Sequence, residues 1–145
     1  MTRGVRNNNP YNIAHRFDVH WKGELPFDSV VENKFCRFES VEYAHRAFVK
    51  LLFTYSRYRG VNTLSKFVDR FCPSTPFVSN KSYKDYLSSM LNLPLQTKVD
   101  LLDLLPSLAE HVCYFESVYV FTDSDSDCVL SYLKEFSYYE KPLFD

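Results

Sequence analysis

The sequence predicts a mainly α-helical (α+β) domain with a small β-hairpin near its N-terminus. The prediction depends on the length of 145 residues, the apolar content of 46%, and a change of pattern near residue 40. Residues 1–39 hold two of the three glycines and only short apolar runs, as loops and short strands do. After residue 40 the apolar residues recur at helical spacing. We therefore expect a single domain over 1–145, with a loop and hairpin portion at 1–39 and a helical portion at 40–137.

The hairpin is expected to pair residues 18–21 with residues 34–38. The first helix then begins after Ser40, whose side chain can cap the first turn, and ends at Gly60, which suits a helix C-terminus. Alanine and large apolar residues recur between these two positions at steps of three and four. The whole stretch is therefore expected to be one helix.

Two further helices are bounded by prolines. One is expected to run from Asn62 or Thr63 to the residues before Pro73, and the next follows Asn80 and ends before Pro94. Each carries an apolar stripe at helical spacing, which is typical of a helix that packs one face on a core.

Two more helices complete the chain. One is expected to begin near Asp103 and Pro106, because proline is well accommodated in a first helical turn, and to end at residues 116–118. The last begins at Thr122 or Asp123, where the aspartates of DSDSD suit the positive end of the helix dipole. A calcium loop would need glycine and glutamate at positions where this chain has cysteine and lysine, so calcium is not expected.

Composition excludes several classes of function. A net charge of −1 and a pI near 6.4 give no basic surface, so no nucleic-acid partner is expected. No run approaches the roughly 18 apolar residues of a membrane span, and no apolar core of a signal peptide follows the N-terminus. The four cysteines form no C-x-x-C pair, which predicts free thiols. His111 and Cys113 alone are too few ligands for zinc, so neither a metal nor another cofactor is predicted.

One acidic residue, Glu116, differs from the others by its position. It stands at the expected end of an apolar helix, in CYFESVYVF, whereas most acidic residues lie at helix starts or on polar faces. The negative end of a helix dipole and burial against aromatic rings both raise the pKa of a carboxyl group. A carboxylic acid that stays protonated near neutral pH can donate a proton to a glycosidic oxygen. The alternative is a helix-end glutamate that faces solvent.

The chain opens with an unusual cluster of amide side chains in RGVRNNNPYNI, residues 3–13. Each amide both donates and accepts hydrogen bonds. Asn7, Asn8, Asn9 and Asn12 are therefore either a turn that satisfies its own backbone or the rim of a polar binding site.

Several motifs follow one another in a recognisable order. They are RGVRNNNPYNI, the Trp-x-Gly of HWKGE, the Phe-x-x-Phe of FCRF, and a Tyr, Gly, Asn-Thr series before a proline. In this order they resemble the virion-associated peptidoglycan-degrading proteins of bacteriophages and prophages, from residue 3 to about residue 130. The resemblance implies a lysozyme-like helical domain, related to lytic transglycosylases, that cleaves the glycan strand of the bacterial cell wall for genome entry or lysis.

The resemblance also implies roles for single residues. Glu116 stands where the group has the glutamate of His-Glu-Asn-Gly, which implies a catalytic acid. The protein would be a virion component made in the host cytoplasm without a signal peptide, and it would act at the cell wall or periplasm. Its partners would be peptidoglycan glycan strands and other virion proteins. The implied substrate-binding residues are Arg6, Asn7, Asn8, Asn9, Asn12, Trp21 and Ser117.

Two departures from the group favour other interpretations. Phe115 replaces histidine and Val118 replaces glycine, so the backbone is not expected to turn at residue 118 as it does in the group. One alternative is a catalytically inactive virion protein that binds peptidoglycan or a partner, using an aromatic tail for docking. A cell-wall endopeptidase on the same fold is the other. The tail aromatics are Phe136, Tyr138, Tyr139 and Phe144.

Overall fold

The computed structural model describes residues 1–144, and side chains up to residue 138, so the side chains of Tyr139 and Phe144 lie outside the described residues. The structure is mainly helical, as the sequence predicts. The chain forms α1 (Arg3–Arg6), α2 (Val41–Tyr58), α3 (Leu64–Phe71), α4 (Lys81–Leu91), the 3₁₀ helix η1 (Leu101–Leu104), α5 (Ser107–Ser117) and α6 (Asp123–Phe144).

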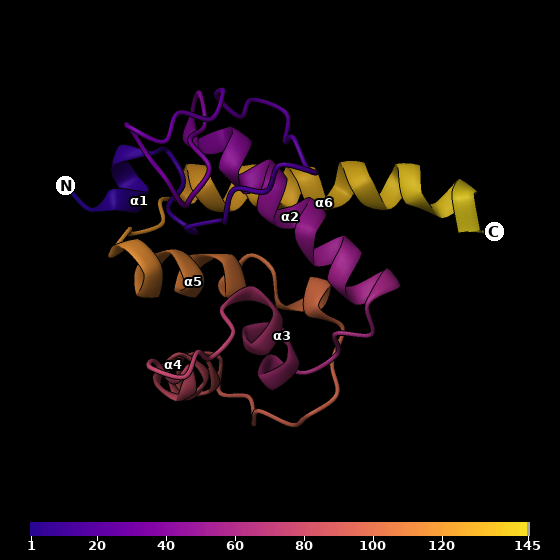
Figure 1. Ribbon diagram of the computed structural model, residues 1–145. Helices are drawn as coiled ribbons and strands as arrows, with labels where there is room; N and C mark the ends of the chain where they lie inside the picture. Colours follow the sequence, from indigo (N-terminus) through magenta and orange to yellow (C-terminus); the bar gives the residue numbers. More distant parts are fainter. Residues whose placement is uncertain (145) are drawn as a thin grey trace.

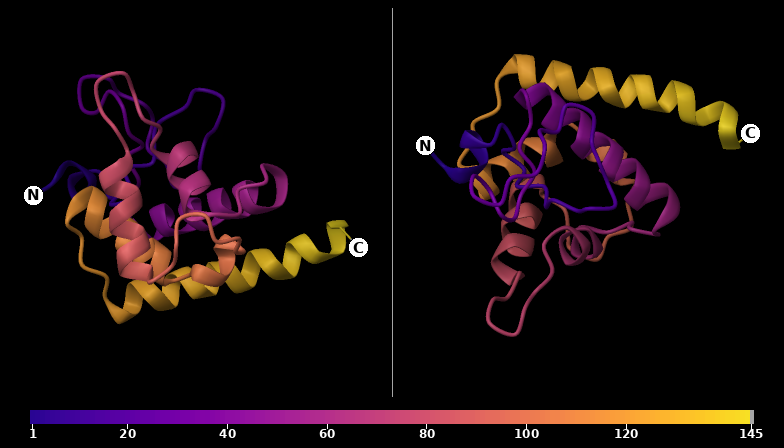
Figure 2. Two further views of the ribbon diagram at one scale, coloured as in Figure 1. Left: turned by 90° about the horizontal axis from the view of Figure 1, so that it is seen from below. Right: turned by 45° about the horizontal axis from the view of Figure 1, so that its top comes forward.

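Helix α5 runs between two groups of elements (Figure 1). Helices α3 and α4 lie on one side of it, and α4 packs directly against it. The N-terminal segment, α2 and α6 lie on the other side, where α1 contacts α5 and α2 contacts α6. The C-terminal half of α6 extends beyond the rest of the molecule (Figure 2). Both groups therefore meet at α5, the helix that ends with the candidate acid.

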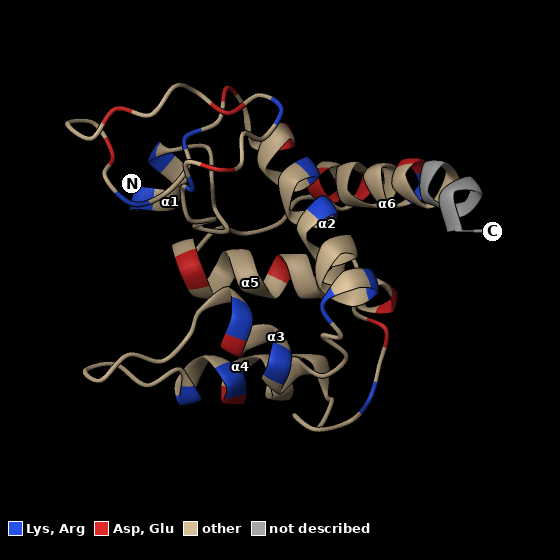
Figure 3. Cartoon of the chain, turned by 45° about the vertical axis from the view of Figure 1, so that its right-hand side comes forward, with Lys and Arg blue, Asp and Glu red and all other residues tan. Residues whose placement is uncertain are grey.

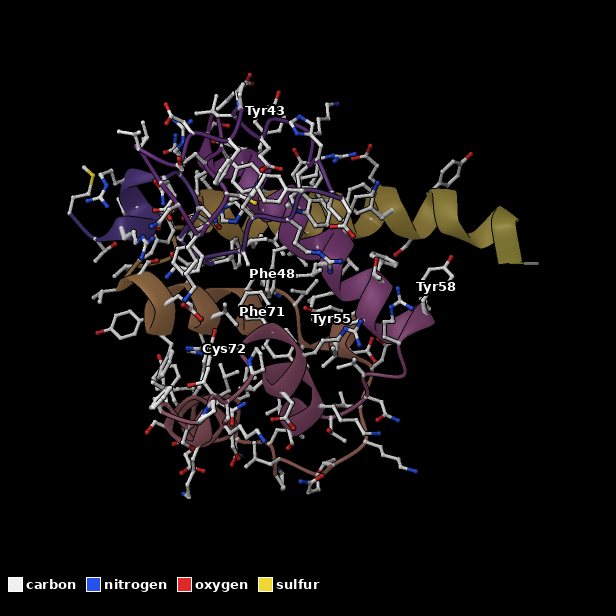
Figure 4. All side chains as sticks on the ribbon, in the orientation of Figure 1. Tyr43, Phe48, Tyr55, Tyr58, Phe71 and Cys72 are labelled. Atoms are coloured by element: carbon white, nitrogen blue, oxygen red, sulfur yellow. The ribbon has the colours of Figure 1, made fainter. Side chains whose placement is uncertain are left out.

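The core is built on the aromatic faces of these helices. Phe48 of α2 is fully buried, stacks on Tyr11 with ring centres 4.2 Å apart, and meets Phe71 edge-on at 5.8 Å. Figure 4 shows Phe48 and Phe71 facing each other between α2 and α3. Such ring pairs each contribute about 0.5–1.5 kcal/mol beyond the area they bury. Through Phe48, these contacts connect the N-terminal segment and α2 on one side of the molecule with α3 on the other.

The predicted boundaries of α2 to α5 and the start of α6 are confirmed, but α6 continues past the expected end at residue 137 to Phe144, and a short helix, α1, lies in the expected loop portion. Helix α2 begins directly after Ser40, but the Ser40 side chain makes no capping hydrogen bond. Thr63 does cap α3, because its hydroxyl accepts a hydrogen bond from Lys66 N at 3.1 Å. Thr122 caps α6 reciprocally: Asp125 N donates to the Thr122 hydroxyl at 3.1 Å, and Thr122 N donates to the Asp125 carboxylate at 2.9 Å. DSDSD therefore begins a helix.

The predicted hairpin is not formed, and the described residues contain isolated bridges instead of strands. The pairs are Ala14 with Phe35, Arg16 with Val19, and Glu24 with Phe38. The segment 34–38 therefore pairs with residues on either side of the expected partner, 18–21. One physical reason is the buried Asn9 amide, which donates to the carbonyl oxygens of Ile13 and Cys36 at 3.0 and 2.9 Å.

The distribution of charge agrees with the composition. Basic and acidic residues are interspersed along the chain in the view of Figure 3. Within residues 1–144, none of the helices has the length and apolar character needed to cross a bilayer.

Candidate functional site

The end of α5 positions Glu116. The helix ends at Ser117, and Val118 follows in the left-handed conformation, with φ 52° and ψ 35°. Val118 N donates to Tyr114 O at 2.9 Å, and Tyr119 N donates to Cys113 O at 3.3 Å, which closes the last turn. The backbone therefore turns here as a glycine would, and the expectation drawn from the Gly-to-Val departure is wrong.

The Glu116 carboxyl group is half-buried and held by one asparagine. Asn12 Nδ2 donates to Glu116 Oε1 at 3.1 Å and lies 3.3 Å from Glu116 O. Burial raises the pKa of Glu116, while Asn12, Tyr83 and the positive charge of Lys34 act in the opposite direction without cancelling it. The structure thus places Glu116 and Asn12, 104 positions apart in the sequence, in one hydrogen-bonded pair.

Gly4 explains how the N-terminal motif reaches α5. A Cβ atom at this position would lie 2.0 Å from Ser117 Oγ and 3.0 Å from Asn12 Oδ1, so only glycine permits this approach. The Thr2 hydroxyl adds a hydrogen bond to Ser117 O at 2.8 Å. Gly4 of the first motif therefore lies directly against Ser117 of the Glu-Ser doublet.

The four asparagines of the motif have different roles. Asn7 and Asn9 are buried and use their amides inside the protein: Asn7 Nδ2 donates to Glu32 Oε1 at 2.9 Å, and Asn9 bridges two backbone carbonyls. They fit the interpretation of a turn that satisfies its own groups. Asn8 is exposed and donates to Phe38 O at 3.1 Å. Asn12, with a φ of 53°, is the one at the carboxyl group.

The other predicted binding residues are placed as follows. Ser117 adjoins Glu116 and is buried. Arg6 is exposed on α1. Trp21 is half-buried with its side chain packed against the core, and its backbone N–H donates to Glu24 Oε1 at 3.1 Å.

Three buried polar atoms around Glu116 have no hydrogen-bond partner among the described residues. They are Asn12 Oδ1, Ser117 Oγ and the hydroxyl of Tyr83. Tyr83 of α4 is 3% exposed, and the nearby Glu116 charge helps burial to raise its pKa. Buried polar atoms are almost always paired with protein, water or ligand. Asn12 Oδ1 and Ser117 Oγ therefore leave hydrogen-bonding capacity unused next to Glu116, whereas the Tyr83 hydroxyl acts on the carboxyl group itself.

Aromatic side chains border this polar site, and the sequence prediction missed one of them. Tyr83 stacks on Phe115 with ring centres 4.1 Å apart, and Tyr86 lies 5.3 Å from the same ring. Phe115 and Tyr114 remain 39% and 46% exposed. The sequence predicts Tyr83 only as one of the apolar-stripe residues of the helix between Asn80 and Pro94, because spacing does not show that its hydroxyl lies near Glu116.

A second polar network lies inside the protein and was also missed. His45 of α2 is fully buried, with Nδ1 2.7 Å from the Tyr11 hydroxyl and Nε2 2.8 Å from Asp125 Oδ1. Burial lowers the pKa of His45, although Asp125 opposes that shift. Tyr119 also donates to Asp125, at 2.9 Å. Because the network is enclosed, it joins the N-terminal segment, α2 and α6 rather than forming an open triad.

No family model matches the chain. Over 100 residues it is 27% identical to "Protein P5" of Pseudoalteromonas phage PM2. The chain is similar to a bacteriophage protein. The matched region covers 68% of this chain and 61% of P5, so it spans less than two thirds of that relative.

Proposed function

We propose that this chain is a phage- or prophage-encoded peptidoglycan-degrading enzyme of the lytic transglycosylase or muramidase type, with a lysozyme-like domain. The observation that carries the proposal is the Glu116 carboxyl group: it is half-buried, has a raised pKa, and is hydrogen-bonded by Asn12 of the N-terminal motif. The similarity to a phage protein supports the phage context. We further propose that the protein is carried in the virion and acts on the cell wall.

In the proposed reaction, one side chain transfers protons in both directions. Glu116 donates its proton to the glycosidic oxygen as the bond to the sugar breaks. The resulting carboxylate then takes the proton of the muramic acid 6-hydroxyl, whose oxygen closes a 1,6-anhydro ring. The Asn12 amide orients the carboxyl group through Oε1. No second carboxylate is needed, in contrast to two-carboxylate glycosidases.

The surroundings of Glu116 suit a polar sugar with apolar faces. Asn12 Oδ1, Ser117 Oγ and the Tyr83 hydroxyl are buried, so a bound sugar would have to open this contact before its hydroxyl and N-acetyl groups could pair with them. The exposed rings of Tyr114 and Phe115 offer flat apolar surfaces beside them. Asn8, Arg6 and Trp21 remain proposed contacts farther along the glycan.

The test is digestion of purified cell walls followed by mass spectrometry of the products. We expect wild-type protein to release muropeptides with anhydromuramic ends, and Glu116→Gln to reduce that release at least about 100-fold while it remains folded. Glu110→Gln, on the same helix, is the matched control and should keep the activity. Full activity of Glu116→Gln would refute the assignment of the acid, and products cut only in the peptide would show an endopeptidase.

An inactive cell-wall binder is the second candidate, and the exposed aromatic residues at the end of α5 favour it. It predicts that the protein sediments with insoluble peptidoglycan and releases no fragments. Replacing Phe115 by Ala would then weaken sedimentation without any change in turnover.

A further inference from the structure

Three potential metal ligands lie together in the N-terminal portion of the chain. They are the imidazole of His15, the carboxylate of Glu24 and the thiol of Cys36. One ligand atom of each lies within 4.8 Å of the other two, and His15 Nδ1 is 3.0 Å from Glu24 Oε2. No spacing motif in the sequence links these residues.

The backbone brings the three ligands together from neighbouring segments. Cys36 N donates to Ile13 O at 2.9 Å on one side of the segment 34–38, and Leu25 N donates to Arg37 O at 2.7 Å on the other. His15 therefore comes from one neighbour, Glu24 from the other and Cys36 from the middle. The ring of Phe27 stacks on His15 with centres 4.3 Å apart and gives this ligand an apolar neighbour.

Glu24 is a buried carboxylate that lacks a lysine or arginine partner in the described part of the chain. Its side chain is 2% exposed, and its contacts include the imidazole of His15, the Cys36 thiol and the backbone N–H of Trp21, with His20 Nδ1 3.9 Å away. A carboxylate removed from water needs a compensating cation. His15 Nε2 is also buried without a hydrogen-bond partner among the described residues. Among the described residues, imidazole groups are thus the only possible cationic partners of this buried carboxylate.

We propose that His15, Glu24 and Cys36 bind a divalent metal ion of the zinc class. Ligands at about 2.0–2.3 Å from Zn²⁺ lie about 3–4 Å from one another, so the three side chains need only a small contraction to coordinate it. The combination of thiolate, imidazole and carboxylate favours zinc over calcium or magnesium, which prefer oxygen ligands alone. A water molecule or the exposed His20, whose Nδ1 lies 3.9 Å from Glu24 Oε1, would complete the coordination.

The ion would stabilise the part of the chain that has the least regular structure. Residues 14–38 contain all three isolated bridges of the described residues, and no strand. This region has no continuous ladder of backbone hydrogen bonds between its segments. One ion bound to three neighbouring segments would hold them together instead. The same segment includes residues near Asn12, so its order also keeps the N-terminal motif on α5.

The experiment uses the full chain, stripped with EDTA, and Co²⁺ as a spectroscopic substitute for Zn²⁺. We expect one Co²⁺ per chain, a sulfur-to-cobalt charge-transfer band, its displacement by Zn²⁺, and a melting temperature that rises with Zn²⁺ and falls with EDTA. Cys36→Ser should abolish the band, and His15→Gln and Glu24→Gln should weaken binding at least tenfold. Cys72→Ser and Cys128→Ser are matched controls that keep the band.

The outcome is independent of the proposed cell-wall activity, because every readout is of metal binding. A folded wild-type chain with no charge-transfer band on Co²⁺ addition would overturn the proposal, and so would a band that persists in Cys36→Ser. If Cys36→Ser does not fold, the tenfold loss of affinity in His15→Gln decides. An unchanged affinity in that variant overturns the proposal.

Discussion

The left-handed conformation of Val118 makes a quantitative prediction about stability. A φ of 52° costs a β-branched residue about 1–2 kcal/mol, whereas glycine adopts it without a steric cost. Val118 is 63% exposed, so removing its side chain loses little buried apolar area and little hydrophobic stabilisation. Glycine also makes the unfolded chain more flexible, which costs about 0.4–1 kcal/mol. Val118→Gly should therefore raise the free energy of unfolding by about 0.5–1 kcal/mol.

Urea unfolding followed by circular dichroism measures this change, and a thermal scan should show a rise of roughly 2–4 °C per kcal/mol. Val120→Gly is the matched control. Val120 is similarly exposed, at 71%, but has no positive φ, so its replacement should lower stability by about 0.4–1 kcal/mol. The reasoning is refuted if Val118→Gly is destabilised as much as Val120→Gly, because the turn would then not be strained.

Further predictions concern the contacts around α5 and the acid response. Gly4→Ala should lower the free energy of unfolding by about 1–3 kcal/mol, because its methyl group meets Ser117; urea unfolding checks this. Hydrogen bonds, led by that from Arg3, hold the pKa of Glu32 below its ordinary range. Glu32 therefore stabilises the fold above about pH 4 and loses this effect as the pH falls, so Glu32→Gln should flatten the stability profile between about pH 5 and 2. Tyr83→Phe should raise the pKa of Glu116, because the Tyr83 hydroxyl acts to lower it; a carbon-13 NMR titration checks this.

Helix boundaries were predictable because their causes are local. Thr63 and Thr122 cap helices through residues three positions away, and Pro73 and Pro94 prevent a helix from continuing. The hairpin was not predictable in the same way. Its segments pair through single bridges fixed by the side chain of Asn9, which is a tertiary contact that alternation of residue types does not report.

The candidate site was predicted in part. The sequence indicates both parts of the site: Glu116 by its position at a helix end, and the N-terminal motif by its resemblance to a known family. Only the structure shows that the two parts touch, through Asn12 at Glu116 and Gly4 at Ser117. Burial of Asn7 and Asn9 could not be read from residue types, because a structural amide and a binding amide look alike in a sequence. The residues of the His45 network and of the His15 cluster are not spaced in the sequence as any known motif is. Their proximity could therefore not be predicted from the sequence.

The central claim is that the Glu116 carboxyl group keeps its proton at higher pH than an ordinary glutamate. A carbon-13 NMR titration of the side-chain carboxyl groups measures this directly, with Glu116→Gln identifying the resonance. We predict a pKa above the ordinary value of about 4.3 for Glu116 and a further change in that pKa when Asn12 is replaced by Ala. A Glu116 pKa at or below the ordinary value would contradict the account, since the group would then be ionised and unable to donate a proton.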